Sequence, residues 1–110
     1  MKAIGIDLGT TNSAVTVYDE RRDMASIVAN AESENLTPSV VGVRRRDGGE
    51  NLVYVGRNAL NWEERQPKET VRSVKRLMGR DFADPVVTTA RDRLSYQIVP
   101  GSDEDPRAHV

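Results

Sequence analysis

The chain has 110 residues, the length of one small domain, and 30% of them are charged. Sixteen basic residues against seventeen acidic ones leave a net charge of −1, which provides no long-range attraction to nucleic acid or to an anionic membrane. Cysteine is absent and His109 is the only histidine, which excludes disulfides, thiol catalysis and a multi-histidine metal site. The sequence shows no signal peptide and no membrane-spanning run, so we expect a cytoplasmic protein.

The first third of the sequence predicts a three-stranded antiparallel meander. Residues 3–8 are typical of a short strand buried on both faces, and the β-branched and aromatic residues 13–18 predict its neighbour. Residues 24–28 fit a third strand. A small polar turn at residues 9–12 joins the first two strands, and a charged turn at residues 19–23 joins the next two.

The rest of the sequence predicts a small hairpin followed by helices. The hairpin strands are residues 39–43 and 52–55, and the three arginines at its tip are typical of a solvated turn. The later predicted elements are a helix over 58–66, a helix from Thr70 to Met78 that ends at Gly79, a helix capped by Asp84 and opened by Pro85, a strand over 94–99, and an acidic loop over 100–106.

The turn at residues 9–12 has the chemistry of an anion site. Gly9 has no Cβ, so backbone amides can approach an anion closely, and Thr10 and Thr11 add hydroxyl donors. Asp7, at the end of the preceding strand, offers a carboxylate for a hydrated magnesium ion. The same residues also fit an ordinary hairpin turn with local hydrogen bonds. Neither a Walker loop nor a Gly-x-Gly-x-x-Gly motif is present.

Residues 5–13 (GIDLGTTNS) resemble the opening signature of the seventy-kilodalton heat-shock proteins, the DnaK-type chaperones. Three further stretches resemble the same family in the same order, namely residues 30–39, 55–59 and 74–80. The likeness extends from about residue 3 to residue 99. Asn12 stands where bacterial members also have asparagine and animal members have tyrosine, which points to a bacterial-type relative.

Two residues of the stretch at residues 30–39 depart from the family pattern. The family usually has glycine where Ser33 stands and arginine where Asn35 stands. Because glycine adopts backbone conformations that serine disfavours, a different path is expected for this loop.

Lys75 lies in the stretch at residues 74–80, which resembles the same family. In a helix, Val71, Val74, Leu77 and Met78 would form one apolar stripe, with Lys75 on its border. Such a lysine can lie along the core and project its amine into a cleft, or simply into solvent. The resemblance implies that Lys75 is the family's catalytic, phosphate-contacting lysine. We expect Trp62 and Met78 to pack, and Glu63 and Glu64 to be solvated.

The resemblance implies an α/β fold, the actin-like (ribonuclease-H-like) ATPase fold, of which residues 1–110 form the N-terminal part without a complete second domain. It implies ATP or ADP and Mg²⁺ as cofactors. The implied catalytic residues are Lys75 and Asp7, with Asp7 holding Mg²⁺ through water, and the implied nucleotide-binding residues are Gly9, Thr10, Thr11, Asn12 and Lys75.

The implied function is ATP hydrolysis in a stress-response chaperone that assists protein folding. The implied partners are unfolded peptides, bound through a separate domain, a J-domain co-chaperone and a nucleotide-exchange factor, with no nucleic acid or membrane partner. In the family, the second phosphate loop and the adenosine pocket come from later sequence, so we expect this chain alone to be inactive and to self-associate. Two alternatives are a sugar kinase or filament-forming relative of the same fold, and a non-catalytic interaction fragment.

Overall fold

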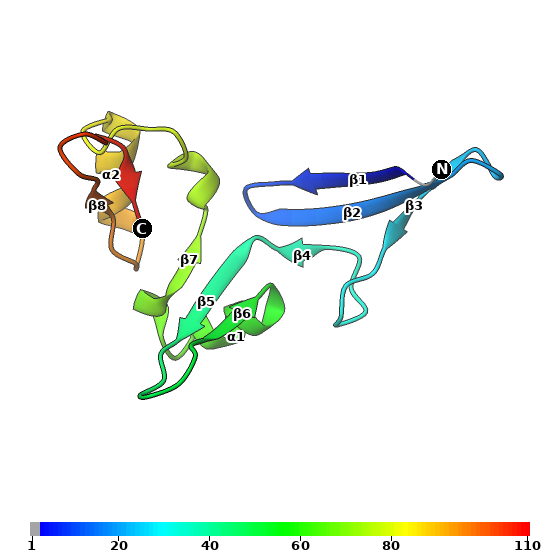
Figure 1. Cartoon of the computed structure of the whole chain (residues 1–110), viewed down its shortest axis with the longest axis horizontal. Helices are drawn as coiled ribbons and strands as arrows, with labels where there is room; N and C mark the ends of the chain where they lie inside the picture. The colour runs from blue at the N-terminus through cyan, green and yellow to red at the C-terminus, as the bar shows by residue number, and fades with distance from the viewer. Residues whose placement is uncertain (1–2) are drawn as a thin grey trace.

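The computed structural model describes residues 3–110, which extend over 52 × 32 × 25 Å (Figure 1). An antiparallel meander lies at one end, a second small sheet with a helix lies in the middle, and a helix with a short hairpin lies at the other end. None of the helices in these residues is long and apolar enough to cross a membrane.

The first sheet is the predicted meander. Strands β1 (Ala3–Leu8), β2 (Asn12–Asp19) and β3 (Met24–Val28) pair in that order, all antiparallel. The two-residue strand β4 (Thr37–Pro38) pairs with the start of β2. Asn12 therefore lies inside β2, opposite Pro38, rather than in the predicted turn.

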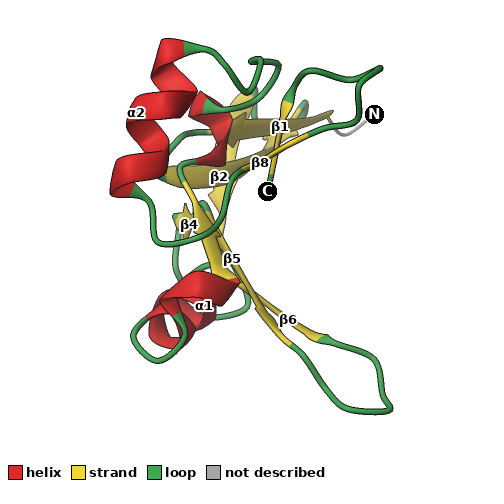
Figure 2. Cartoon of the chain, turned by 90° about the vertical axis from the view of Figure 1, so that its left-hand side faces the viewer, coloured by secondary structure: helices red, strands yellow, loops and turns green. Residues whose placement is uncertain are grey.

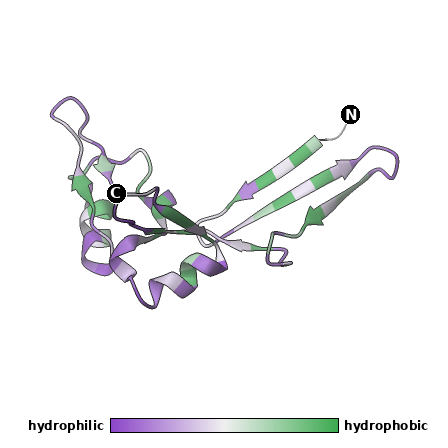
Figure 3. Cartoon of the chain, turned by 60° about the horizontal axis from the view of Figure 1, so that its bottom comes forward, coloured by the Kyte–Doolittle hydropathy of each residue, from purple (hydrophilic) through white to green (hydrophobic). Residues whose placement is uncertain are grey.

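The prediction that residues 3–8 are buried on both faces is wrong. Every residue of β1 is exposed, and the side chains of Ile4 and Ile6 are 68% and 72% exposed. The register places Ile6, Val15 and Val28 in one row across the three strands. Figure 3 shows why this face is open, since the meander projects from the rest of the described chain and no helix packs against it.

The second sheet has the order β6-β5-β7 and carries helix α1 (Figure 2). Its strands are β5 (Val40–Arg44), β6 (Leu52–Val55) and β7 (Thr70–Arg72), and α1 comprises Arg57–Glu63. The predicted hairpin is confirmed, and so is the helix, which ends three residues earlier than predicted.

Trp62 anchors α1 to this sheet, as predicted for a packing residue. Its ring lies 5.3 Å from that of Tyr54, measured between centroids. A Cβ at Gly42 would approach Trp62 Cδ1 to 2.8 Å, so the absence of a side chain on β5 creates the space for the indole. This close contact holds helix and sheet together.

The predicted helix from Thr70 to Met78 is wrong. Thr70 and Val71 are β-branched and pair with β5 as strand β7, opposite Gly42 and Val41. Ser73 then adopts a left-handed conformation (φ 55°), which ends the strand. A short 3-10 helix of one turn, η2 (Val74–Arg76), follows it. Sheet pairing by β-branched residues thus overrides the helical spacing of the apolar side chains.

Two expectations for side chains near this segment change as a consequence. Met78 is 66% exposed rather than packed, because the apolar stripe on which it was placed does not exist. Glu63 is not simply solvated, since its carboxylate pairs with Arg72 on the adjacent strand at 3.5 Å.

The C-terminal part packs around helix α2 (Pro85–Arg93), which begins as predicted. A 3-10 turn η1 (Pro67–Glu69) joins α1 to β7 within the middle part, and η2 leads from the middle sheet toward α2. The core consists of Leu77, Val87, Tyr96 and Ile98. The strand predicted over 94–99 reduces to β8 (Val99–Pro100), paired with β9 (Ala108–His109), because Tyr96 and Ile98 are buried in that core.

The start of α2 provides a stability prediction. The Asp84 carboxylate accepts a hydrogen bond of 2.8 Å from the amide of Val86, as an N-cap does. We expect Asp84→Ala to lower the free energy of unfolding by about 1 kcal/mol in urea denaturation. Asp84→Asn keeps an acceptor and should lose less than half of that, whereas Asp92→Ala on the exposed face of α2 serves as the control. Equal losses for Asp84→Ala and Asp92→Ala would contradict the capping role.

Candidate functional site: the turn between the first two strands

The turn between β1 and β2 is tight enough to require glycine. A Cβ built on Gly9 would lie 2.3 Å from the carbonyl oxygen of Asn12. This separation is too short for any residue with a side chain. The sequence therefore permits a close backbone crossing at this position only because residue 9 has no side chain. Such a crossing presents several peptide groups at one end of the sheet.

Two carbonyl oxygens of this turn are bonded, whereas the donors of Thr10 and Thr11 are free. Gly9 O accepts from the Ser39 hydroxyl at 2.7 Å, and Thr11 O accepts from the Ser39 amide at 2.8 Å. Within residues 3–110, the amides and hydroxyls of Thr10 and Thr11 have no hydrogen-bond partner. A turn with free amide and hydroxyl donors is suited to bind an anion.

Lys75 reaches this turn from a distant part of the sequence. Its Nζ donates a hydrogen bond of 2.7 Å to the carbonyl oxygen of Leu8, 67 residues away. The kink at Ser73 and the turn η2 place it there, rather than the border of a helix. An ammonium group has three donors, so two remain available after the bond to Leu8.

Asp7 is exposed on β1, opposite Ala14. Side chains alternate along a strand, so Asp7 lies on the opposite face from Ile6 and Leu8. No cluster of three or more His, Cys, Asp or Glu residues is found in the described part of the chain, which leaves Asp7 as a single carboxylate. Magnesium is commonly held in this way, by one or two carboxylates together with water and phosphate oxygens.

A small pocket of about 220 Å³ lies between the turn and the second sheet. Its lining residues are Thr10, Thr11, Ser39, Val40, Arg72 and Ser73. Arg72 and Ser39 were not among the predicted site residues. A helix over residues 70–78 would turn Arg72 away from its apolar stripe, and only the pairing of β7 with β5 explains the place of Arg72 beside the turn.

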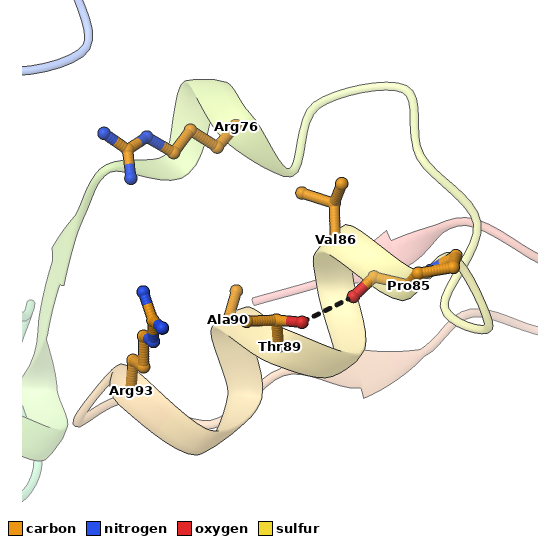
Figure 4. A pocket seen from close by; sticks show the side chains of 6 residues that line it. All are labelled: Arg76, Pro85, Val86, Thr89, Ala90 and Arg93. Atoms are coloured by element: carbon orange, nitrogen blue, oxygen red, sulfur yellow. Dashed lines mark hydrogen bonds between the residues drawn. The ribbon is translucent and has the colours of Figure 1, made fainter.

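A second hollow, of about 340 Å³, lies between η2 and α2 and contains none of the predicted site residues (Figure 4). Arg76 and Arg93 border it, and Pro85, Val86 and Ala90 supply apolar surface. The Thr89 hydroxyl is bonded within the helix, to Pro85 O at 3.0 Å. Arg76 thus borders a hollow separate from the turn, whereas its neighbour Lys75 contacts the turn.

The family model described as Hsp70 protein matches residues 3–110. Because this match covers nearly the whole chain, the chain belongs to the Hsp70 family, a family of ATP-dependent chaperones. Its mixed α/β structure, an antiparallel meander followed by few helices, agrees with the N-terminal part of the actin-like ATPase domain of that family, as the sequence predicts.

The family supplies the general context of this site. Hsp70 proteins bind ATP or ADP with Mg²⁺, hydrolyse ATP, and generally work with J-domain proteins and nucleotide-exchange factors. The residues present fit such a ligand on two counts. The free donors of Thr10 and Thr11 suit phosphate oxygens, and Asp7 suits a hydrated cation.

Proposed function

We propose that this chain carries the first phosphate-binding turn and the catalytic lysine of a DnaK-type ATPase domain. The observation that supports this most strongly is the 2.7 Å hydrogen bond from Lys75 to Leu8 O. It joins the glycine-threonine turn to a lysine that lies 67 residues away along the chain. Chance packing of an unrelated domain gives no reason for these two segments to meet.

Each residue has a distinct part in the proposed site. Mg-ATP, when bound, supplies the phosphoryl group to be transferred and a metal charge beside it. The amides of Thr10 and Thr11 donate to phosphate oxygens, Gly9 permits their close approach, and Asn12 fixes the end of the turn within β2. Asp7 holds the hydrated magnesium ion through water.

Lys75 contributes positive charge at the same place. Phosphoryl transfer develops negative charge on the oxygens of the transferred group and on the leaving oxygen, so a fixed ammonium stabilises the transition state more than the ground state. The bond to Leu8 O fixes the ammonium before any ligand arrives, which reduces the reorganisation that the reaction requires.

The wider activity follows from family membership. We propose a bacterial-type cytoplasmic chaperone of the stress response, in which ATP turnover drives the capture and release of unfolded peptides by another domain. A J-domain co-chaperone and a nucleotide-exchange factor would be its partners. The balanced charge of the chain supports the expectation of no nucleic-acid or membrane partner.

Different observations bear on the two alternative functions. The Hsp70 match favours the chaperone over a sugar kinase or a filament-forming protein. The open apolar face of the meander favours a role in association, either beside catalysis or in place of it.

Phosphate release from Mg-ATP by the full-length protein distinguishes these functions. Turnover that rises with unfolded peptide or a J-domain protein would support the chaperone. Turnover that depends on a sugar or on polymerisation would favour the kinase or filament relative, and no turnover above background would leave the interaction role.

A further inference from the structure

Among residues 3–110, Ser39 is the one residue that donates hydrogen bonds to the turn from both its backbone and its side chain. It lies between β4 and β5 and is half-buried. Its amide donates to Thr11 O at 2.8 Å, and its hydroxyl donates to Gly9 O at 2.7 Å. A single residue at the junction of the two sheets therefore holds two carbonyl groups of the turn.

A second serine fixes the direction of the hydroxyl bond. Ser13 Oγ lies 2.8 Å from Ser39 Oγ. A hydroxyl has one proton, and that of Ser39 is donated to Gly9 O, so Ser13 must donate to Ser39. The hydrogen bonds therefore run from Ser13 to Ser39 and from Ser39 to Gly9 O. The final acceptor belongs to the peptide group that links residues 9 and 10.

The geometry of that peptide group connects Ser39 to ligand binding. In a trans peptide, the carbonyl and the amide of one plane point in opposite directions. The carbonyl of Gly9 points at Ser39, so the amide of Thr10 points away from it, and this amide has no partner among residues 3–110. The direction of a free donor in the turn is thus set by the Ser39 hydroxyl.

The loop that carries Ser39 is itself braced. The Asn30 carboxamide accepts from the amides of Glu32 and Glu34, at 3.0 and 2.9 Å, and donates to Thr37 Oγ1 at 3.0 Å. Arg57 of α1 makes a bidentate pair with Glu34, at 2.7 and 2.8 Å, and this pairing lowers the pKa of the Glu34 carboxyl. These contacts hold Ser39 in place relative to both sheets.

We propose that Ser39 is a positioning residue for nucleotide binding, which aims the Thr10 amide at a phosphate oxygen through its hydrogen bond to Gly9 O. The inference rests on the proposed function and adds to it a residue outside the phosphate-binding turn and the lysine segment. Ser39 acts through the turn rather than on the phosphate. Removal of its hydroxyl leaves every donor of the turn in place but no longer fixes the direction of the Thr10 amide.

The test compares Ser39→Ala with a matched deletion of the same kind of bond. The Ser95 hydroxyl also donates to a backbone carbonyl, Pro67 O at 3.0 Å, far from the turn. In the full-length protein, we expect Ser39→Ala to raise the dissociation constant for Mg-ADP by roughly five- to tenfold in calorimetric titration, the effect of one or two lost hydrogen bonds. Ser95→Ala should change it less than twofold, although both variants lower the melting temperature.

A conservative variant separates positioning from folding. Ser39→Thr keeps the hydroxyl and should bind Mg-ADP within about twofold of the wild type. Wild-type affinity in Ser39→Ala, or equal loss in Ser95→Ala, would overturn the role of Ser39 and leave the proposed function standing. Absence of Mg-ADP binding by the wild-type protein would overturn the proposed function, and the role of Ser39 in nucleotide binding with it.

Discussion

Substitution of Lys75 by methionine should reduce ATP hydrolysis in the full-length protein by two to three orders of magnitude, the usual effect of removing one preorganised group from a transition state. The dissociation constant for ATP should change only a few-fold, because the ammonium acts mainly on charge that develops during transfer. Methionine keeps the length and apolar character of the lysine stem, so the fold around η2 should persist. Single-turnover hydrolysis and equilibrium ATP binding together measure the two effects.

Arg76→Met is the matched control for this substitution. Arg76 is the next residue of η2 and borders the hollow beside α2 instead of the turn, so its loss should leave hydrolysis within a few-fold of the wild type. Parallel losses of binding and turnover in Lys75→Met would make Lys75 a uniform binding contact. Unchanged turnover would show that Lys75 has no part in catalysis and that its ammonium only contacts Leu8 O and solvent.

The 110-residue chain on its own should neither hydrolyse ATP nor remain monomeric. Among its described residues, the proposed site has one wall, formed by the turn and Lys75, and the structure shows no second wall that excludes water from it. Positioning and preorganised charge both require an enclosed site, so turnover should fall to background. A phosphate-release assay on the purified chain measures this, and magnesium-dependent turnover by a monomer would contradict it.

Self-association has a separate structural cause, the open face of the meander. The apolar residues exposed on this face are Ile4, Ile6, Leu8, Val15, Met24 and Val28. Contiguous apolar surface of this kind, next to an edge strand with unpaired backbone groups, favours pairing between copies. Ile6→Lys should therefore shift the chain toward monomer in light scattering.

Ala25→Lys provides the control for that change. Ala25 is exposed in the same sheet, but the register places it on the opposite face, beside Tyr18. Added charge alone would affect both variants equally. Association that persists in Ile6→Lys, or that disappears equally in Ala25→Lys, would show that this face is not the contact.

The fold was predictable wherever local sequence and tertiary pairing agree. The meander, the hairpin, helix α1 and the N-cap of α2 follow from alternation, turn residues and capping, and the structure has them all. The segment from Thr70 to Met78 was mispredicted because its apolar residues have helical spacing, while its β-branched residues pair with β5. Only the partner strand decides between these two possibilities, and a local pattern does not contain that partner.

The site residues also differ in whether their role could be predicted from nearby sequence. Gly9, Thr10 and Thr11 could be selected because their chemistry is local to one turn, and Lys75 because its segment resembles the family. Ser39 could not be assigned a role, because its significance lies in two bonds to residues about thirty positions away. The conformation of Ser33 (φ 61°) also differs from what its residue type favours, and it suits the glycine that the family usually has there. Ser33 thus adopts a left-handed conformation that serine disfavours.

A crystal structure of the full-length protein with Mg-ADP and inorganic phosphate tests the central claim most directly. We predict phosphate oxygens within hydrogen-bonding distance of the Thr10 and Thr11 amides, Lys75 Nζ beside the same anions, and a magnesium-bound water on Asp7. Nucleotide bound elsewhere, with the amides of the turn free and Lys75 still bonded to Leu8 O alone, would contradict the account.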